Sequence, residues 1–177
     1  MTMAHLLDPF IVFDPDGHEV RMGQLWAERT AVLMFVRHFG CLFCRQQIAS
    51  IGPFLDRIRS CRAELFVVGH GSPEDARAFA AEQPLRAPLL TDPSRRSYCA
   101  LDMRRGLASV LTPAVAARSL TALRAGFRQS RVAGDPLQQG GVVVIAPGGV
   151  ERFRFISQSA GDHPTPHQIL SALQVSS

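Results

Sequence analysis

Residues 31–48 read AVLMFVRHFGCLFCRQQI and decide the fold of the chain. The stretch Ala31–Arg37 is almost continuously apolar, which is typical of a strand buried on both faces. After the loop His38–Gly40, apolar positions recur every three or four residues up to about Arg59, and this spacing predicts a long helix. Gly52-Pro53 interrupts the pattern and predicts a bend, because proline removes a helical hydrogen bond.

The rest of the chain continues the alternation of strands and helices. Glu64–Gly69 is a second apolar strand, and Ser72-Pro73-Glu74-Asp75 has the capping serine, early proline and acidic residues that begin a helix. Two late strands flank a Pro-Gly-Gly turn, and the second alternates apolar and polar residues as a half-buried edge strand does. The other predicted elements are strands at 10–14, 18–21, 89–90, 142–146 and 150–156, and helices near 92–101, 106–126 and 164–173.

This order predicts an α/β protein with a thioredoxin-like fold. Parallel β-α-β units come first, and an antiparallel hairpin and a closing helix follow. The expected architecture is a central mixed β-sheet flanked by helices on both faces. A chain of 177 residues is long enough for one such domain and short for two. Residues 1–177 are therefore interpreted as a single domain with a helical insertion at about 103–130.

Charge and hydropathy argue against two classes of partner. The net charge is +4, but the basic residues, all of them arginine, are scattered along the chain, whereas a nucleic-acid binder concentrates them on one face. No window has the roughly 18 uncharged apolar residues that a membrane span needs. Residues 1–9 lack the cationic segment and apolar run of a secretory signal, so we expect a cytoplasmic protein that binds neither nucleic acid nor membrane.

Cys41 and Cys44 form a C-x-x-C pair at the predicted start of the long helix. The first turn of a helix presents free N–H groups and a positive dipole end, which stabilise a thiolate, the reactive form of cysteine. Arg37 and Arg45 add positive charge on either side, and His38 either tunes the thiolate or is an exposed loop histidine. By helical phase Cys44 faces the core and Cys41 lies nearer the exposed tip. Cys41 is therefore the candidate for first attack and Cys44 for resolving a mixed disulfide.

Other functions for the pair stay open at this point. Zinc binding would need further ligands from His38, His70, Cys61 or Cys99, since no second paired motif exists. The pair could also be two core thiols, or the chain a redox-sensing or interaction module without catalysis. We interpret Cys61 and Cys99 as packing residues and His70, at the end of a core strand, as a hydrogen-bonded structural histidine. No metal and no bound cofactor are predicted.

Several blocks of the sequence together resemble one family. The blocks are VLMFVRHFGCLFCRQQ, FVVGHGSPEDARAFA, LLTDPSRRSYCAL, GDPLQQGGVVVIAPGG and SQSAGDH. They are similar to the peroxiredoxin-like branch of the AhpC/TSA superfamily, which includes the prostamide/prostaglandin F synthase type. The resemblance covers nearly the whole chain and implies a thioredoxin fold and a thiol-based antioxidant activity that extends to peroxide reduction. Its functional residues carry over only to Cys41 and Cys44.

The chain departs from ordinary peroxiredoxins at two places. The motif around the active site of those enzymes resembles P-x-x-x-T-x-x-C, and its last residue is the attacking cysteine. Aligned with this chain, that cysteine would be Cys44. Cys41 then replaces the threonine and Arg37 the proline. Residues 139–141, Gln-Gly-Gly, stand where such enzymes supply an arginine.

We therefore predict an enzyme, a thiol–disulfide oxidoreductase, that cycles between a Cys41/Cys44 dithiol and a disulfide. A peroxide or a disulfide is its expected substrate. Electrons would come from a thioredoxin- or glutathione-type donor. A homodimer is compatible with the resemblance, because related folds often dimerise.

Overall fold

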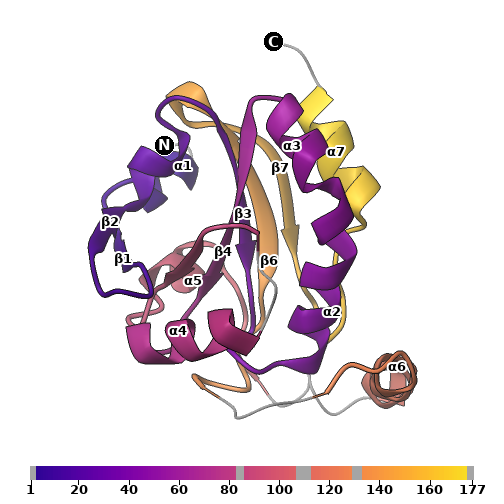
Figure 1. Ribbon diagram of the computed structural model, residues 1–177. Coiled ribbons are helices and arrows are strands. Elements are labelled where there is room, and N and C mark those ends of the chain that lie inside the picture. Colours follow the sequence, from indigo (N-terminus) through magenta and orange to yellow (C-terminus); the bar gives the residue numbers. More distant parts are fainter. Residues whose placement is uncertain (1–2, 83–85, 107–112, 129–132, 175–177) are drawn as a thin grey trace.

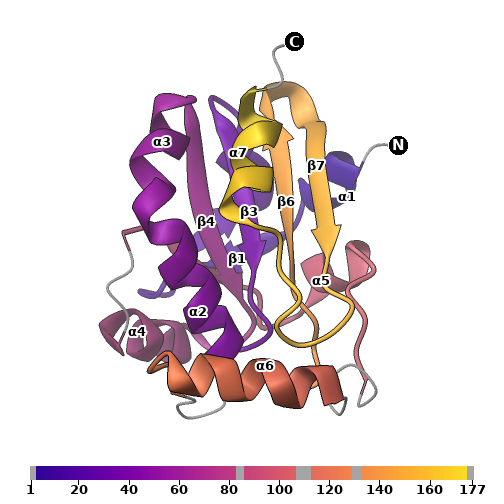
Figure 2. The ribbon, with the colours of Figure 1, turned by 90° about the vertical axis from the view of Figure 1, so that its right-hand side faces the viewer.

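The computed structural model describes residues 3–82, 86–106, 113–128 and 133–174. These residues form one mixed β-sheet with the strand order β2-β1-β5-β4-β3-β6-β7, and helices cover both of its faces (Figures 1 and 2). The strands are β1 (Ile11–Phe13), β2 (Glu19–Arg21), β3 (Thr30–Phe35), β4 (Ala63–Gly69), β5 (Leu89–Thr91), β6 (Gly141–Ala146) and β7 (Val150–Ile156). The α-helices are α1 (Met3–Leu7), α2 (Leu42–Ile51), α3 (Leu55–Ser60), α4 (Pro73–Glu82), α5 (Arg96–Ala100), α6 (Pro113–Arg124) and α7 (Pro166–Gln174). The predicted α/β fold is confirmed.

Strand β3 lies in the middle of the sheet, parallel to β4 and antiparallel to β6. Alternate side chains of a strand point to opposite faces, so its apolar run feeds two cores. One core contains Val32, Met34 and Val36, together with side chains of α2, α3, α4 and α7. The other contains Ala31, Leu33 and Phe35, with side chains of α1 and α5. This double burial explains why the run lacks the polar alternation of a half-exposed strand.

The predicted long helix is bent where the sequence places the bend. Helix α2 ends at Ile51, a 3₁₀ turn covers Gly52–Phe54, and α3 continues from Leu55. Cys41 is the N-cap residue of α2, with an extended backbone, and Cys44 lies in the first turn. The C-x-x-C pair therefore lies at the junction that follows the central strand, as predicted.

Two positions, the one before β6 and the first of β6, require glycine because another backbone segment passes close to each. A Cβ atom on Gly140 would lie 2.1 Å from the carbonyl oxygen of Phe35, and one on Gly141 would lie 2.4 Å from that of Phe155. The hairpin partner, β7, is the edge strand of the sheet, as its alternating sequence predicts. The Gln-Gly-Gly stretch thus has a structural reason, because side chains at 140 and 141 would push β3 and β7 away.

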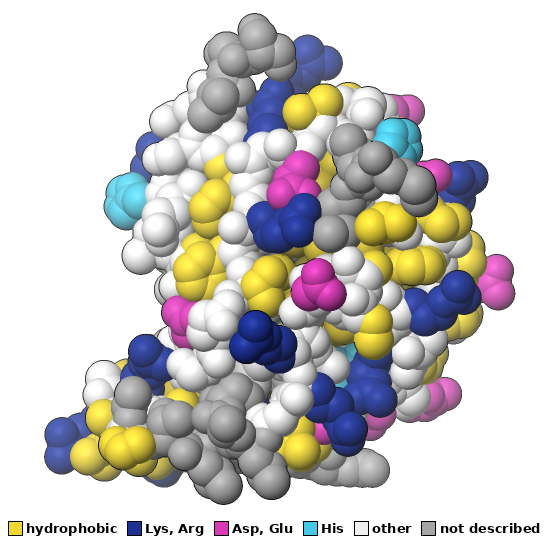
Figure 3. Space-filling model, turned by 180° about the vertical axis from the view of Figure 1, so that it is seen from behind, with side chains coloured by type: hydrophobic (Ala, Val, Ile, Leu, Met, Phe, Trp, Pro, Cys, Tyr) yellow, Lys and Arg dark blue, Asp and Glu magenta, His cyan; other side chains and the backbone are white. Residues whose placement is uncertain are grey.

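Helix α6 lies across one end of the sheet, below the start of α2 in Figure 2. Val115 and Ala122 are buried on its inner side, whereas Leu120 and Leu123 are exposed. Figure 3 shows apolar and basic side chains together on this protruding helix. The predicted insertion at about 103–130 contains α6, while 107–112 and 129–130 lie outside the described residues. The interpretation of residues 1–177 as a single domain stays a prediction. No helix in the described ranges has the length and apolar character to cross a membrane.

Candidate active site

Cys41 and Cys44 lie together at the N-terminus of α2, and both are free thiols. The turn that precedes them includes Gly40, whose φ of 89° is a left-handed backbone conformation that glycine adopts without strain. The backbone N–H of Arg45 then donates to the carbonyl of Cys41, which is the first hydrogen bond of the helix. Sequence and structure agree on this placement, because it depends only on neighbouring residues.

The predicted exposure of Cys41 is wrong. Only 1% of Cys41 is exposed, the same fraction as for Cys44. Helical phase correctly turned Cys44 toward the core, but it says nothing of what covers the end of a helix. Distant parts of the chain do lie against this end of α2, since α6 packs against α2 and the backbone of Ala133 hydrogen-bonds that of Phe39. Both sulfurs therefore lie inside the protein in this state.

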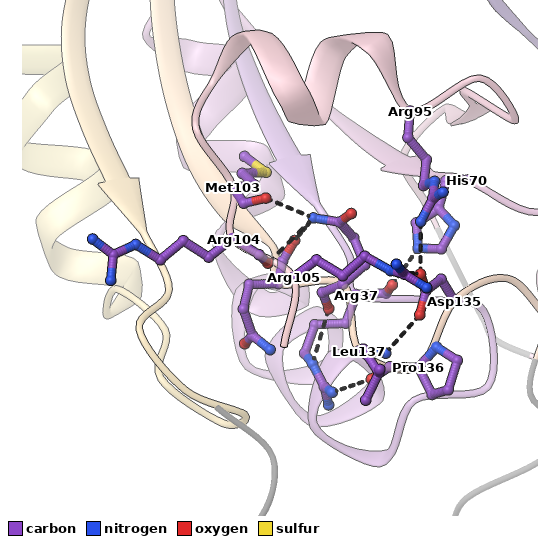
Figure 4. Close-up of polar contacts among 11 residues, drawn as sticks. Arg37, His70, Arg95, Met103, Arg104, Arg105, Asp135, Pro136 and Leu137 are labelled. Carbon is purple, nitrogen blue, oxygen red and sulfur yellow. Dashed lines mark hydrogen bonds and ion pairs between the residues drawn. The ribbon is translucent and has the colours of Figure 1, made fainter. Parts of the chain in front are cut away.

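Arg37 contacts both sulfurs through different groups. Its backbone N–H donates to Sγ of Cys44 at 3.3 Å, and its guanidinium Nη1 lies 3.7 Å from Sγ of Cys41. The same guanidinium donates to the carbonyls of Pro136 at 2.6 Å and Gln138 at 3.3 Å (Figure 4). A buried cation is unfavourable unless it is compensated. A thiolate at Cys41 would provide that compensation.

The two thiols have opposite acidities. The hydrogen bond from Cys44, followed by the charges of Arg37 and His38, lowers the pKa of Cys41 to about 5, although burial opposes this shift. Burial, followed by the Cys41 sulfur, raises the pKa of Cys44 well above its ordinary value. The pair thus shares one proton, which stays on Cys44 at neutral pH and is donated toward the Cys41 thiolate.

Two histidines flank Arg37 from different sides. His38 is buried, and its Nδ1 lies 2.9 Å from the carbonyl oxygen of Phe39. His70 follows β4 and its Nε2 hydrogen-bonds the carbonyl of Arg37, as expected for a structural histidine. Burial lowers the pKa of His70, so its ring is neutral at pH 7 and can donate from Nε2. Both rings are thus engaged by backbone carbonyls beside the cysteine pair.

Asp135 anchors the loop that holds the Arg37 guanidinium. Its carboxylate receives ion pairs from Arg95, at 2.6 Å, and from Arg105, and it also accepts the backbone N–H of Leu137 at 2.9 Å (Figure 4). Hydrogen bonds from Leu137 and the two arginines lower the pKa of Asp135, outweighing the burial that raises it. The negative charge of Asp135 therefore fixes the carbonyls that Arg37 needs.

His163 lies near Arg37 and near the backbone of Phe43, the residue before Cys44. Its Nε2 atom is buried and has no hydrogen-bond partner among the described residues. Burial, followed by the charges of Arg37 and Arg118, lowers its pKa to about 4. Arg118 of α6 donates to Ser159 and to the carbonyl of Ala160, so the helix is tied to the loop that carries His163. A neutral ring thus closes this part of the site.

The other candidate residues lie elsewhere. The Arg45 guanidinium pairs with Glu82 and lies 5.5 Å from the ring centre of Phe79, toward α4, so its predicted influence on the thiolate stays a prediction. Cys61 is partly buried and packs against the core. Cys99 is exposed, so its interpretation as a packing residue is wrong.

The zinc alternative would need three or more metal-ligating side chains around the pair, and the described residues place no such group there. Within the described ranges, the only three side chains that could share one metal ion are Asp14, Asp16 and His18, on an exposed turn. His38 and His70 instead hydrogen-bond backbone carbonyls.

Sequence reasoning did not single out Asp135, Tyr98 or His163. Asp135 and Tyr98 bond residues that lie 30 and 62 positions away in the chain, so no local spacing reveals them. The local signal for His163 is the SQSAGDH block, in which the family resemblance assigns no role to the histidine.

Known proteins resemble this chain in sequence and in structure. The family described as AhpC/TSA antioxidant enzyme matches residues 51–159. Thioredoxin-like protein AAED1, chloroplastic, from Arabidopsis thaliana is 32% identical over 96% of this chain and 72% of its own length. Prostamide/prostaglandin F synthase from Xenopus tropicalis is 32% identical over 90% of this chain and 81% of its own length.

Among solved structures, peroxidoxin BcpB from Mycobacterium tuberculosis superposes with a TM-score of 0.70 at 16% identity, covering 95% of this chain and 94% of its own. That likeness shows the fold, and the sequence matches show the family. The chain belongs to the AhpC/TSA antioxidant enzyme family, as a thiol-dependent oxidoreductase of peroxiredoxin type.

Proposed function

We propose that the enzyme reduces small peroxides by cycling between the Cys41/Cys44 dithiol and a disulfide, with Cys41 as the attacking sulfur. The observation that carries this proposal is the position of Arg37, whose guanidinium lies 3.7 Å from Sγ of Cys41. A cation at this distance stabilises the thiolate and is near the oxygens of a peroxide that approaches the same sulfur.

The attacking role of Cys41 follows from the acidity of the pair. With its pKa lowered to about 5 by Cys44 and Arg37, Cys41 is a thiolate at neutral pH, whereas Cys44 keeps its proton. This reverses the order that the ordinary peroxiredoxin pattern implies, in which Cys44 would attack. Cys41 is also the N-cap residue of α2, at the positive end of the helix dipole, which favours a thiolate.

The chemistry balances as a two-electron cycle. The Cys41 thiolate attacks one peroxide oxygen, the O–O bond breaks, and the other oxygen takes a proton and leaves as an alcohol or water. Cys41 is now a sulfenic acid. Cys44 attacks its sulfur, water leaves, and the Cys41–Cys44 disulfide forms. One thioredoxin-type dithiol, or two molecules of a glutathione-type thiol, returns two electrons and two protons.

A small substrate suits the site better than a protein disulfide does. Cys41 is 1% exposed, so a protein substrate could reach it only after the loop 133–139 or α6 moved. A small pocket of about 70 Å³ is lined by Gly40, which precedes Cys41 in the chain, and by Phe79 and Ala133, while neither cysteine is among its lining residues. Its size fits a molecule of a few atoms. The protein reductant would need the cover to open, which makes the reduction step the slower half of the cycle.

Thiol trapping and intact mass spectrometry test the proposal. In a Cys61→Ser/Cys99→Ser background, stoichiometric peroxide should remove about two hydrogen masses per chain by closing the disulfide. Cys44→Ser should accumulate sulfenic acid on Cys41, and Cys41→Ser should react slowly.

Two results would overturn parts of this assignment. Sulfenic acid that accumulates faster in Cys41→Ser than in Cys44→Ser would make Cys44 the attacking sulfur. If the Cys41/Cys44 pair stays reduced under excess peroxide, the chain is better explained as an interaction module without catalysis.

A further inference from the structure

One peptide group links the core to the inner cysteine. The peptide between Val36 and Arg37 follows β3, and its N–H donates to Sγ of Cys44 at 3.3 Å. Its carbonyl, that of Val36, accepts the hydroxyl proton of Tyr98 at 2.8 Å. The Tyr98 hydroxyl therefore lies at one end of a peptide group whose other end contacts the sulfur.

Tyr98 is held rigidly in this position. It is fully buried on α5, and its ring packs edge-on against Phe35 and His70, each with a ring-centre distance of 5.2 Å. Its hydroxyl has a single proton, shared between the carbonyls of Val36 and Val68, which lies 2.9 Å away. A phenol in this position bonds backbone groups only, so its effect on the site passes through the peptide.

We propose that Tyr98 is a positioning residue for the resolving step, because its hydroxyl polarises the Val36–Arg37 peptide and so strengthens the N–H that stabilises the Cys44 thiolate. The inference rests on the proposed function, in which Cys44 closes the disulfide. Hydrogen bonds in a chain polarise one another, and a carbonyl that accepts a proton makes the N–H of the same peptide a better donor. Cys44 needs this help, because it must lose its proton inside the core.

The other groups around Cys44 do not replace this contact. Among the described residues, the charged and titratable neighbours that affect Cys44 are Cys41 and Arg37, and Tyr98 lies close enough for Cys44 to affect it in turn. During closure Cys41 carries the bound group and has no charge to offer. Burial, followed by the charges of Asp92 and Cys44, raises the pKa of Tyr98 well above its usual range, so the hydroxyl stays a donor throughout.

The closing step can be measured separately from the attack. In the Cys61→Ser/Cys99→Ser background, methyl methanethiosulfonate converts the Cys41 thiolate to a methyl disulfide and releases methanesulfinate. Cys44 then attacks Sγ of Cys41 and releases methanethiol. Acid-quenched intact mass gives the closure rate as a function of pH. The loading rate of Cys41 is measured in the same background with Cys44→Ser.

Tyr98 is the only tyrosine in the chain, which allows two opposite changes. Tyr98→Phe removes the donor, and closure at neutral pH should slow roughly three- to fivefold, the order expected for one hydrogen bond. Biosynthetic replacement of tyrosine by 3-fluorotyrosine gives a more acidic donor and should speed closure. Cys41 loading should stay unchanged in both proteins. Ser97 lies beside Tyr98 on α5, and Ser97→Ala, which removes a buried hydrogen bond to Asp92 in the preceding loop, controls for loss of stability.

The amide proton of Arg37 reads the same effect without any turnover. Its NMR resonance should move upfield in Tyr98→Phe, as a weaker donor does, and downfield with fluorotyrosine. Three results would each overturn the inference. The first is that Tyr98→Phe slows the loading of Cys41 as much as the closure of the disulfide, and the second is that Tyr98→Phe and 3-fluorotyrosine both slow closure. The third is an Arg37 amide resonance that does not move. If the wild-type pair never closes, the proposed function fails, and the Arg37 resonance alone decides whether Tyr98 polarises the peptide.

Discussion

The guanidinium of Arg37 and the sulfur of Cys41 meet inside the protein at 3.7 Å, four residues apart along the chain. Arg37 is 5% exposed, so its charge acts through protein rather than water. The loop carbonyls that share this guanidinium fix its direction toward the sulfur. One side chain thereby links the proposed nucleophile, Cys41, to the loop carbonyls of Pro136 and Gln138.

Removing the Arg37 charge should make Cys41 less acidic. An opposite charge at this range lowers a pKa by roughly one to three units, so Arg37→Met should raise the midpoint of Cys41 alkylation by about one unit or more. The measurement is the pH dependence of iodoacetamide alkylation in a Cys44→Ser/Cys61→Ser/Cys99→Ser background. Arg45→Met removes the same charge from a guanidinium that pairs with Glu82, and it should shift the midpoint less. Equal shifts would contradict a special role for Arg37.

The thiol proton of Cys44 should matter even more than Arg37 for the acidity of Cys41. The hydrogen bond from Cys44 is the first cause of the low pKa of Cys41, about 5. A serine hydroxyl can donate in its place, whereas an alanine methyl cannot. The alkylation midpoint of Cys41 should therefore lie higher in Cys44→Ala than in Cys44→Ser. Identical midpoints would show that the helix start and Arg37 are sufficient.

Local sequence determined the parts of the site that are close in the chain. The apolar run before Cys41, the helix after it and the Gly52-Pro53 bend were all predictable, since each depends on spacing within a few residues. The burial of Cys41 was not, because its cover comes from far away: Arg37 bonds Pro136 across 99 residues. Tyr98 likewise reaches the carbonyl of Val36 across 62 residues. Contacts of this kind follow from the tertiary arrangement and leave no periodic signal.

Loosening the Asp135 anchor should expose Cys41. Asp135 binds Arg95 and Arg105 at once, so Asp135→Asn weakens two ion pairs and frees the loop that covers the sulfur. Local opening should become easier by about 1 kcal/mol, which corresponds to about fivefold faster alkylation by a bulky maleimide. A small maleimide should gain less. Asp16→Asn, the same change on an exposed turn, is the control, and equal acceleration by both would rule out a local effect.

Any side chain at position 140 should destabilise the protein, because there is no space for it. Its Cβ would lie 2.1 Å from the carbonyl oxygen of Phe35, so Gly140→Ala must separate the strands and should lower stability by about 3 kcal/mol. The same Cβ would lie 3.5 Å from the backbone nitrogen of Arg37, so the disturbance reaches the cysteine pair. Denaturant unfolding measures the loss. Gly52→Ala, where nothing lies within 4 Å, should be neutral, and a similar loss there would refute the spatial argument.

His163 should make the protein sensitive to acid. Its pKa is lowered from 6.5 to about 4, first by burial, so between these values the unfolded chain binds more protons than the native one. Stability from this group is therefore complete above pH 6.5 and is lost as the pH falls toward 4. The melting temperature of His163→Gln should decline less steeply across this window than that of the wild type. His167→Gln, on the exposed side of α7, should keep the wild-type slope, and an equally flattened slope there would show that His163 is not the cause.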